Sequence, residues 1–292
     1  VGYYLIGKGR RRLEQELNIG TRKITENANL YMGGIICLIV VMIGAFLYLT
    51  GVSVSNFSFI LLYALLAVVP IGTIVIGVCN WIITRIYPPT MLPRLEFEGE
   101  IPEEFRTMVV IPTLLTNVAG VKDLVEQMEV FYLANRDKRL HFALVGDYKD
   151  GSKEHELSDD SIVNTAIELI NELNNKYDSD IFFYFHRYRQ FNTSQNLWMG
   201  WERKRGALVE FNRLLRGAED TSYYIQKGNL SILPKIKYVI TLDADTCLPR
   251  DMAKKLIGTL AHPLNRAILN DESTLVTEGY GIIQPRISVS IE

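Results

Sequence analysis

Two aspartates one residue apart, Asp243 and Asp245, are the side chains whose types and spacing most clearly suggest chemistry. They follow an apolar run in which Val239, Ile240 and Leu242 predict a buried strand. Two carboxylates at the end of a buried strand are costly to leave unpaired. A magnesium-type ion, held by one or two carboxylates and by substrate phosphate oxygens, would neutralise them. The pair therefore indicates a cation and phosphate site, although a solitary Asp-x-Asp also fits a solvated turn.

A second group is basic and lies where a helix is expected to begin. Arg203, Lys204 and Arg205 occur together within the stretch from Trp198 to Leu208. A helix N-terminus already favours anions, so cations there oppose the helix dipole. The cluster therefore suits a diphosphate, with a solvated basic face as the alternative. The two tryptophans of the same stretch could stack on a sugar ring or pack in the core.

Alternating strands and helices would bring these groups to one edge of a sheet. The pattern predicts strands at 106–112, 140–145, 181–185 and 239–242, helices at 121–134, 162–173, 201–215 and 250–260, and a last apolar stretch at 280–284. Such alternation predicts an α/β fold, with a mainly parallel sheet covered on both faces. Because parallel strands end at one edge, Thr113, Asp147, Asp243 and Asp245 are expected together. Asp147 could accept a hydrogen bond from a nucleobase or cap a turn.

Composition argues against several other functions. The formal net charge of −2 does not suggest nucleic-acid binding. The four histidines are scattered, without the spacing of metal ligands or of a catalytic triad. The three cysteines suggest no disulfide framework, which favours a reducing, cytosolic setting for the soluble part.

Two uncharged runs, 30–49 and 57–83, are each long enough to cross a bilayer as a helix. The alternative is a pair of buried helices in a large soluble core, but few soluble helices are apolar on every face. Lysines and arginines precede the first run and follow the second, and none lies between the runs. The positive-inside rule then places both ends of the hairpin in the cytoplasm. We therefore expect a multi-pass protein of the cytoplasmic (inner) membrane, with a cytoplasmic segment at 1–29, transmembrane helices within 30–87, a linker at 88–99 and a cytoplasmic domain at 100–292.

Five segments, in one order along the chain, resemble the glycosyltransferase region of cyclic β-1,2-glucan synthases. They are Val110–Leu115, Trp198–Gly206, Ile240–Thr246, Leu260–Asn265 and Glu278–Arg286. Several long matches in one order are far more specific than an Asp-x-Asp alone. The resemblance implies the GT-A fold of nucleotide-sugar transferases, preceded by the membrane hairpin.

The resemblance also implies a reaction and a set of roles. Glucose would pass from UDP-glucose to a growing glucan acceptor, with inversion at the anomeric carbon. Asp243 and Asp245 would hold Mg²⁺ or Mn²⁺ on the donor diphosphate, and the ion would stabilise the leaving UDP. Thr113 and Asp147 would hold uridine, and Lys204 would contact the diphosphate. Arg205, beside Lys204, is included in the nucleotide-sugar site.

Attack by the acceptor hydroxyl needs a carboxylate base. In related transferases this base lies on a later helix, so we expect it beyond Glu292, in a C-terminal region of a larger synthase that this chain lacks. Glu278 is the fallback within the chain. In related processive synthases an asparagine directly follows the Lys-x-Gly-x-Leu pattern, whereas in this chain Asn212 comes several residues after it. The residues that contact the sugar are therefore left open.

Three other functions compete with this interpretation. Another membrane polysaccharide synthase would keep the site but form a different linkage. A non-catalytic remnant would keep the fold and lose the activity. A phosphatase of the haloacid dehalogenase type would need threonine two residues after the second aspartate, where this chain has Cys247.

Overall fold

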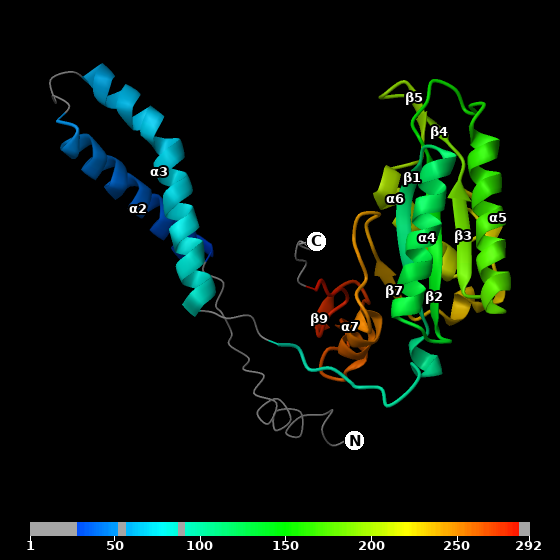
Figure 1. Ribbon diagram of the computed structural model, residues 1–292. Helices are drawn as coiled ribbons and strands as arrows, with labels where there is room; N and C mark the ends of the chain where they lie inside the picture. Colours follow the sequence, from blue (N-terminus) through cyan, green and yellow to red (C-terminus); the bar gives the residue numbers. More distant parts are fainter. Residues whose placement is uncertain (1–27, 52–56, 87–90, 286–292) are drawn as a thin grey trace. The chain divides into compact units, whose positions relative to one another are not determined.

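The computed structural model describes residues 28–51, 57–86 and 91–285, in two compact units that divide between Leu92 and Pro93. The first unit contains two helices, α2 (Ala28–Leu49) and α3 (Phe57–Ile86), drawn in blue and cyan in Figure 1. Both are long and apolar enough to cross a membrane. Most of their large apolar side chains are exposed, which is the opposite of what a core helix would show. The expected segment at 1–29 lies almost wholly outside the described residues.

The second unit is an α/β domain. Its elements in order are η2 (Glu103–Phe105), β1 (Thr107–Leu115), α4 (Val118–Ala134), β2 (Leu140–Tyr148), α5 (Asp159–Tyr177), β3 (Phe182–Arg187), β4 (Gln190–Asn192), β5 (Leu197–Met199), α6 (Arg203–Leu215), β6 (Tyr223–Lys227), η3 (Leu230–Lys235), β7 (Tyr238–Thr241), α7 (Met252–Ala261), β8 (Ile268–Leu269) and β9 (Val276–Glu278).

The central sheet has the strand order β6-β3-β2-β1-β7, and only β6 runs antiparallel to its neighbour. The predicted mainly parallel sheet is therefore confirmed. The chain adds β2 and β3 on one side of β1 and then returns to place β7 on the other side. Ligands of open α/β sheets bind at such a reversal, outside the carboxyl ends of the strands. This position lies between the ends of β1 and β7.

Alternate residues of the strands face two separate cores, as the period of two requires. Val109 and Leu144 belong to the core that includes apolar residues of α4, α5 and α7. Val110 and Val145 belong to the core that includes Ala207 and other residues of α6. Figure 1 shows α4 and α5 lying along the sheet on the first of these faces. The sheet is thus a rigid layer whose carboxyl edge can hold a site.

The sequence predicts that the first strand stops at Pro112, but β1 continues to Leu115. The carbonyl of Val110 accepts from Leu242 N, so the polar groups of Val110 face β7. Pro112, two residues later, faces the same side, but the pairing of β7 with β1 ends at Thr241. The N–H that proline lacks is therefore not needed by a neighbouring strand.

Other boundaries also differ from the expectation. β7 is an edge strand whose residues are half-buried or exposed, not a fully buried strand. α6 and α7 each begin two residues later than predicted, and Pro249 precedes α7 instead of lying in its first turn. The sequence offers Ser158 or Ser161 as the N-cap of α5; Ser158 occupies that position but makes no side-chain capping bond. The apolar stretch at 280–284 forms no strand.

The expected linker at 88–99 divides at Pro93, where the second unit begins. Leu95 N donates to the carbonyl of Gly258 in α7 at 3.0 Å. Asn265 Nδ2 donates to the carbonyl of Pro93 at 2.7 Å. These bonds attach the beginning of the unit to α7, the helix that follows the aspartate pair, and to the turn after that helix.

Candidate active site

Asp243 and Asp245 follow β7 in an exposed loop at the carboxyl edge of the sheet. The side chain of Asp243 is 59% exposed. The expectation that burial makes these carboxylates costly to leave unpaired is therefore wrong, because water solvates both. The carbonyl of Asp243 accepts from Thr246 N at 2.9 Å, so the pair lies in a solvated turn at the place where this fold class binds ligands.

Lys204, in the first turn of α6, forms an ion pair with Asp243. The two residues are far apart in sequence, and the structure brings them together across the carboxyl edge. Because both side chains are about half exposed, the pair contributes little stability of its own. An exposed ion pair of this kind can open at low cost and offer both groups to a ligand.

The aspartates fit a cation that is shared with a substrate. Among the described residues, no group of three or more His, Cys, Asp or Glu side chains is arranged to hold a metal. Asp243 and Asp245 supply two exposed carboxylates, and a magnesium-type ion can complete its coordination with phosphate oxygens and water. Lys204 beside them would add positive charge near the same phosphates.

The three basic residues at the start of α6 take three different partners. Arg203 Nη2 lies 2.7 Å from Asp150 Oδ2, and Arg205 Nη2 lies 3.0 Å from Glu202 Oε2. Only Lys204 contacts the aspartate pair. The structure therefore separates a cluster that the sequence treats as one group, and it brings Lys204 alone to Asp243.

Asp147 and Thr113 lie at the carboxyl ends of β2 and β1. Thr113 is half-buried and lies opposite Gly146 in the register of the two strands. Asp147 is buried, and both of its carboxylate oxygens accept from Arg187, at 2.7 Å and 2.5 Å. Burial raises the pKa of Asp147, and the Arg187 charge opposes that rise. The sequence reasoning missed Arg187, although a charged residue at the end of an apolar strand was a signal that could have indicated it.

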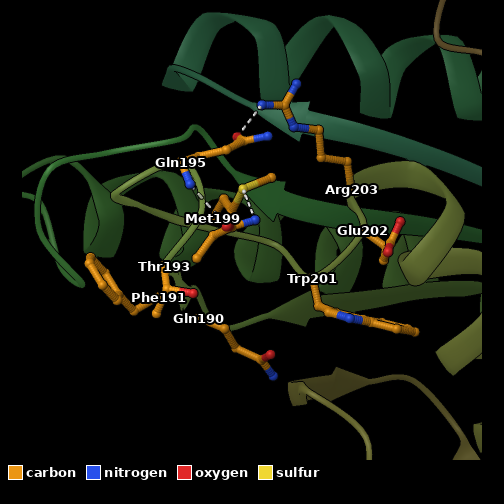
Figure 2. Close-up of a pocket in the computed structure, with 9 residues that line it drawn as sticks. Gln190, Phe191, Thr193, Gln195, Met199, Trp201, Glu202 and Arg203 are labelled. Carbon is orange, nitrogen blue, oxygen red and sulfur yellow. Dashed lines mark hydrogen bonds between the residues drawn. The ribbon is translucent and has the colours of Figure 1, made fainter.

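A pocket of about 530 Å³ lies between the β4–β5 hairpin and the start of α6. Figure 2 shows the amides of Gln190 and Gln195 and the indole of Trp201 around it, with Arg203 reaching Gln195. Trp201 is 44% exposed, whereas Trp198 packs against Phe191 in the hairpin. Amides and an exposed indole suit the hydroxyls and the apolar face of a sugar. The sequence did not predict the hairpin.

No protein-family model matches the chain. A comparison with curated proteins finds 35% identity over 303 residues to the cyclic β-(1,2)-glucan synthase NdvB of Rhizobium meliloti (strain 1021). The chain is related to a glucan synthase over its whole length. It spans 11% of the length of that synthase. The alignment includes both apolar helices and the α/β unit, so the relationship supports the family resemblance of the five motifs.

Proposed function

We propose that this chain carries the donor site of a membrane-anchored, inverting glycosyltransferase of the GT-A type, which transfers glucose from UDP-glucose to a β-1,2-glucan. One observation carries the proposal. Lys204 contacts Asp243 at the reversal point of the parallel sheet, with Asp245 two residues further along the same exposed loop, in a chain related throughout to a glucan synthase.

The donor diphosphate would lie at the aspartate pair. Asp243 and Asp245 would hold a Mg²⁺ or Mn²⁺ ion, which would neutralise the diphosphate and favour the departure of UDP. Lys204 would exchange its contact with Asp243 for a phosphate oxygen. Thr113, at the neighbouring end of β1, would face the uridine, and Arg205 would add to the positive field around the phosphates.

The pocket beside Trp201 would take a sugar unit through its amides and indole. A carboxylate base must remove the acceptor proton, and we assign it to no described residue. Glu278, exposed in β9, remains the fallback. The helices α2 and α3 would anchor the enzyme in the cytoplasmic membrane, with the α/β unit in the cytoplasm.

A synthase with a different linkage would share this donor site, and product analysis would separate the two. A non-catalytic remnant would fail to bind the donor. The phosphatase alternative is weakened because its aspartates belong on an early strand, whereas β7 follows β1, β2 and β3.

The test is a calorimetric titration of the detergent-solubilised chain with UDP and UDP-glucose, with and without Mn²⁺. We expect metal-dependent binding that Asp243→Asn and Asp245→Asn each abolish. Asp220→Asn is the matched control, because Asp220 is an exposed aspartate paired with Arg213 near the far end of α6. Binding that is insensitive to Mn²⁺ and to both site variants would contradict the proposal, as would the absence of binding.

A further inference from the structure

Arg187 at the end of β3 is completely buried, and all five N–H groups of its guanidinium are used. Nε and Nη2 donate to the two carboxylate oxygens of Asp147, and Nη1 donates to Glu210 Oε2 at 3.1 Å. The other two bonds go to main-chain carbonyls, from Nη1 to Trp201 at 3.0 Å and from Nη2 to Arg203 at 2.9 Å. The guanidinium therefore joins two strand ends to the segment that begins α6.

That segment has an unusual backbone. Glu202 and Arg203 have φ angles of 52° and 48°, in the left-handed region that non-glycine residues seldom adopt. Two such residues in a row are strained and persist only when their surroundings hold them. The two bonds from Arg187 bracket them. Gly206 closes the same turn, because an added Cβ there would overlap the carbonyl oxygen of Trp201.

The carboxylates around Arg187 outnumber its single positive charge, so their hydrogen-bond partners matter. Two nearly buried carboxylates, Asp147 and Glu210, share one cation. The second carboxylate is further satisfied by Ser222, whose hydroxyl donates to Glu210 Oε2 at 2.5 Å. Asp147 has both oxygens engaged, and a Cβ on Gly200 would lie 2.8 Å from its Oδ2, so the turn before α6 closes over it. The side chain of Asp147 is only 6% exposed.

We infer that Arg187 and Asp147 act as positioning residues for Lys204: Asp147 orients the guanidinium, the guanidinium holds the strained turn at 201–203, and the turn sets the place of Lys204 beside Asp243. This rests on the proposed function for the identity of the ligand. It differs from the direct uridine contact that the resemblance implies for Asp147. For the ligand, this means that Asp147 affects the binding of a nucleoside diphosphate through the phosphate contact of Lys204 and not through a contact with the base.

Binding of uridine and of UDP with Mn²⁺ to the detergent-solubilised chain separates the two roles. Asp147→Asn keeps the shape of the side chain but turns one acceptor into an NH₂ that faces a guanidinium donor. We expect an unchanged uridine affinity, a loss of about tenfold in UDP affinity, about as large as that of Lys204→Ala, and no further loss in the double variant. A matching loss of uridine affinity, or additive losses in the double variant, would overturn the inference.

Hydrogen exchange of the ligand-free chain gives a readout that does not depend on the proposed function. We expect Asp147→Asn to speed exchange at 203–206 while β1 and α4 keep their protection. Asp159→Asn is the matched control. Asp159 forms an equally buried bidentate pair with Arg189, but that guanidinium donates its remaining bonds to the carbonyls of Lys149 and Glu154 and not to the turn at 201–203.

Glu210→Gln weakens the same guanidinium from the side of α6 and should reproduce the local effect. Unchanged exchange at 203–206 in both variants, or a loss of protection throughout the unit in both, would overturn the inference. If the wild-type chain binds no UDP while exchange at 203–206 responds as expected, the proposed function fails and the positioning role stands.

Discussion

At the scale of the residue, neighbouring cations in one helical turn differ in what they can do. Lys204 contacts Asp243, whereas Arg205 is 76% exposed and pairs with Glu202 three residues before it. We expect Lys204→Ala to weaken UDP binding by about tenfold, which corresponds to the loss of one hydrogen bond to a charged group. Arg205→Ala should change it by less than about twofold. Calorimetry measures both, and equal losses would mean that the cluster acts as one diffuse patch.

Buried histidines predict how stability depends on pH. Burial, and then the charge of Arg106, lower the pKa of His141 to about 4. Arg106 Nη1 lies 2.8 Å from His141 Nε2, so the neutral ring accepts a hydrogen bond from the guanidinium. The unfolded chain takes up this proton near pH 6.5 and the folded chain does not. Below pH 6.5 the unfolded state therefore binds more protons, and acid favours unfolding.

His141→Gln keeps an acceptor for Arg106 and removes the titration. The thermal midpoint of the wild type should fall between pH 6.5 and 4.5, and the variant should fall less, by a difference of about 2 kcal/mol in unfolding free energy. Tryptophan fluorescence during heating measures both. A variant curve parallel to that of the wild type would show that His141 is not the source. His155, which is exposed beside Glu154, supplies the control substitution His155→Gln.

The sequence predicted where some residues of the candidate site lie, and missed others, for a physical reason. The place of Asp243 and Asp245 at the carboxyl edge could be predicted because the loops at the ends of parallel strands converge, whatever the details of packing. Lys204 stood out only as part of a basic cluster at a helix start and through the family resemblance. The charge of Arg187 at the end of an apolar strand could have singled it out, but its partners could not be predicted. They lie on β2, on α6 and on two main-chain carbonyls, and only the register and the backbone turn at Glu202 bring them together. Nothing in the residue types of 200–203 signals two consecutive left-handed residues.

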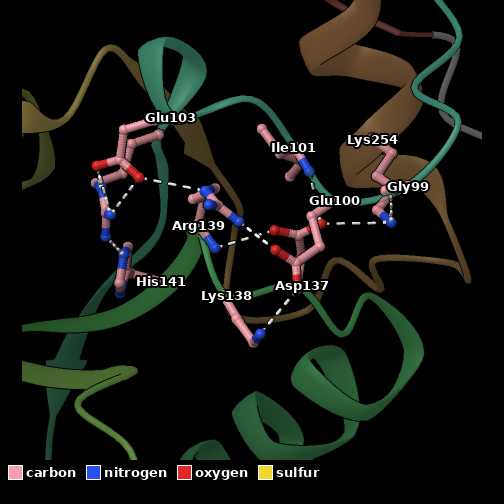
Figure 3. Close-up of polar contacts among 10 residues, drawn as sticks. Gly99, Glu100, Ile101, Glu103, Asp137, Lys138, Arg139, His141 and Lys254 are labelled. Carbon is pink, nitrogen blue, oxygen red and sulfur yellow. Dashed lines mark hydrogen bonds and ion pairs between the residues drawn. The ribbon is translucent and has the colours of Figure 1, made fainter.

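At the scale of the element, α7 is held by the segment that precedes the sheet. Besides the bonds to Pro93 and Leu95, Lys254 Nζ donates to the carbonyl of Gly99 at 3.0 Å. Ile101 N donates to the buried carboxylate of Asp137 at 2.9 Å, and Figure 3 shows these contacts side by side. The loop that carries the aspartate pair leads directly into α7. By holding α7, the segment at 93–101 therefore fixes one end of that loop.

Gly258 in α7 is the tightest point of that contact. A Cβ there would overlap the carbonyl oxygen of Leu95, so Gly258→Ala should push the segment away and cost about 1–3 kcal/mol of unfolding free energy. Gly120→Ala in α4 is the matched control, since the nearest atom to its Cβ would be Asn117 Oδ1 at 3.5 Å. There alanine should stabilise the helix by up to about 1 kcal/mol. The midpoints of thermal unfolding of the two variants measure these effects, and an unchanged midpoint in Gly258→Ala would contradict the packing argument.

Long elements with strong patterns were predicted, and short ones were missed. α4, α5, β2 and β3 carry apolar residues at clear helical or strand periods, and each was found near its expected place. The strands β4 and β5 have three residues each, which is too short for any period to be visible. β6 was missed because four of its five residues are half-buried or exposed, so its sequence lacks a continuous apolar run. Tertiary pairing, not local pattern, forms these three strands.

At the scale of the whole molecule, the two units differ in kind. The large apolar side chains of α2 and α3 are mostly exposed, whereas the α/β unit buries two apolar cores. Exposed apolar surface on helices of this length is typical of segments that lie in lipid. The sequence predicted both helices, since a long uncharged run needs no tertiary information to be recognised.

The three cysteines test this arrangement without further engineering of the fold. Cys37 lies in α2, Cys79 in α3, and Cys247 is exposed two residues after Asp245. In sealed inverted vesicles of the cytoplasmic membrane, a membrane-impermeant maleimide should label Cys247, and it should label Cys37 and Cys79 only after detergent is added. Single-cysteine variants with alanine at the other two positions assign each signal by mass spectrometry.

Orientation follows from the same experiment. From the distribution of lysine and arginine we expect Cys247 on the cytoplasmic side, so sealed right-side-out vesicles should leave it unlabelled. Ser53→Cys, between the two helices and in a chain without the three native cysteines, should give the reverse pattern. Labelling of Cys37 in sealed vesicles would show that α2 does not lie in the bilayer. Labelling of Cys247 in right-side-out vesicles would leave the assignment of the membrane helices intact. It would place the donor site on the side away from cytoplasmic UDP-glucose and so contradict the proposed reaction.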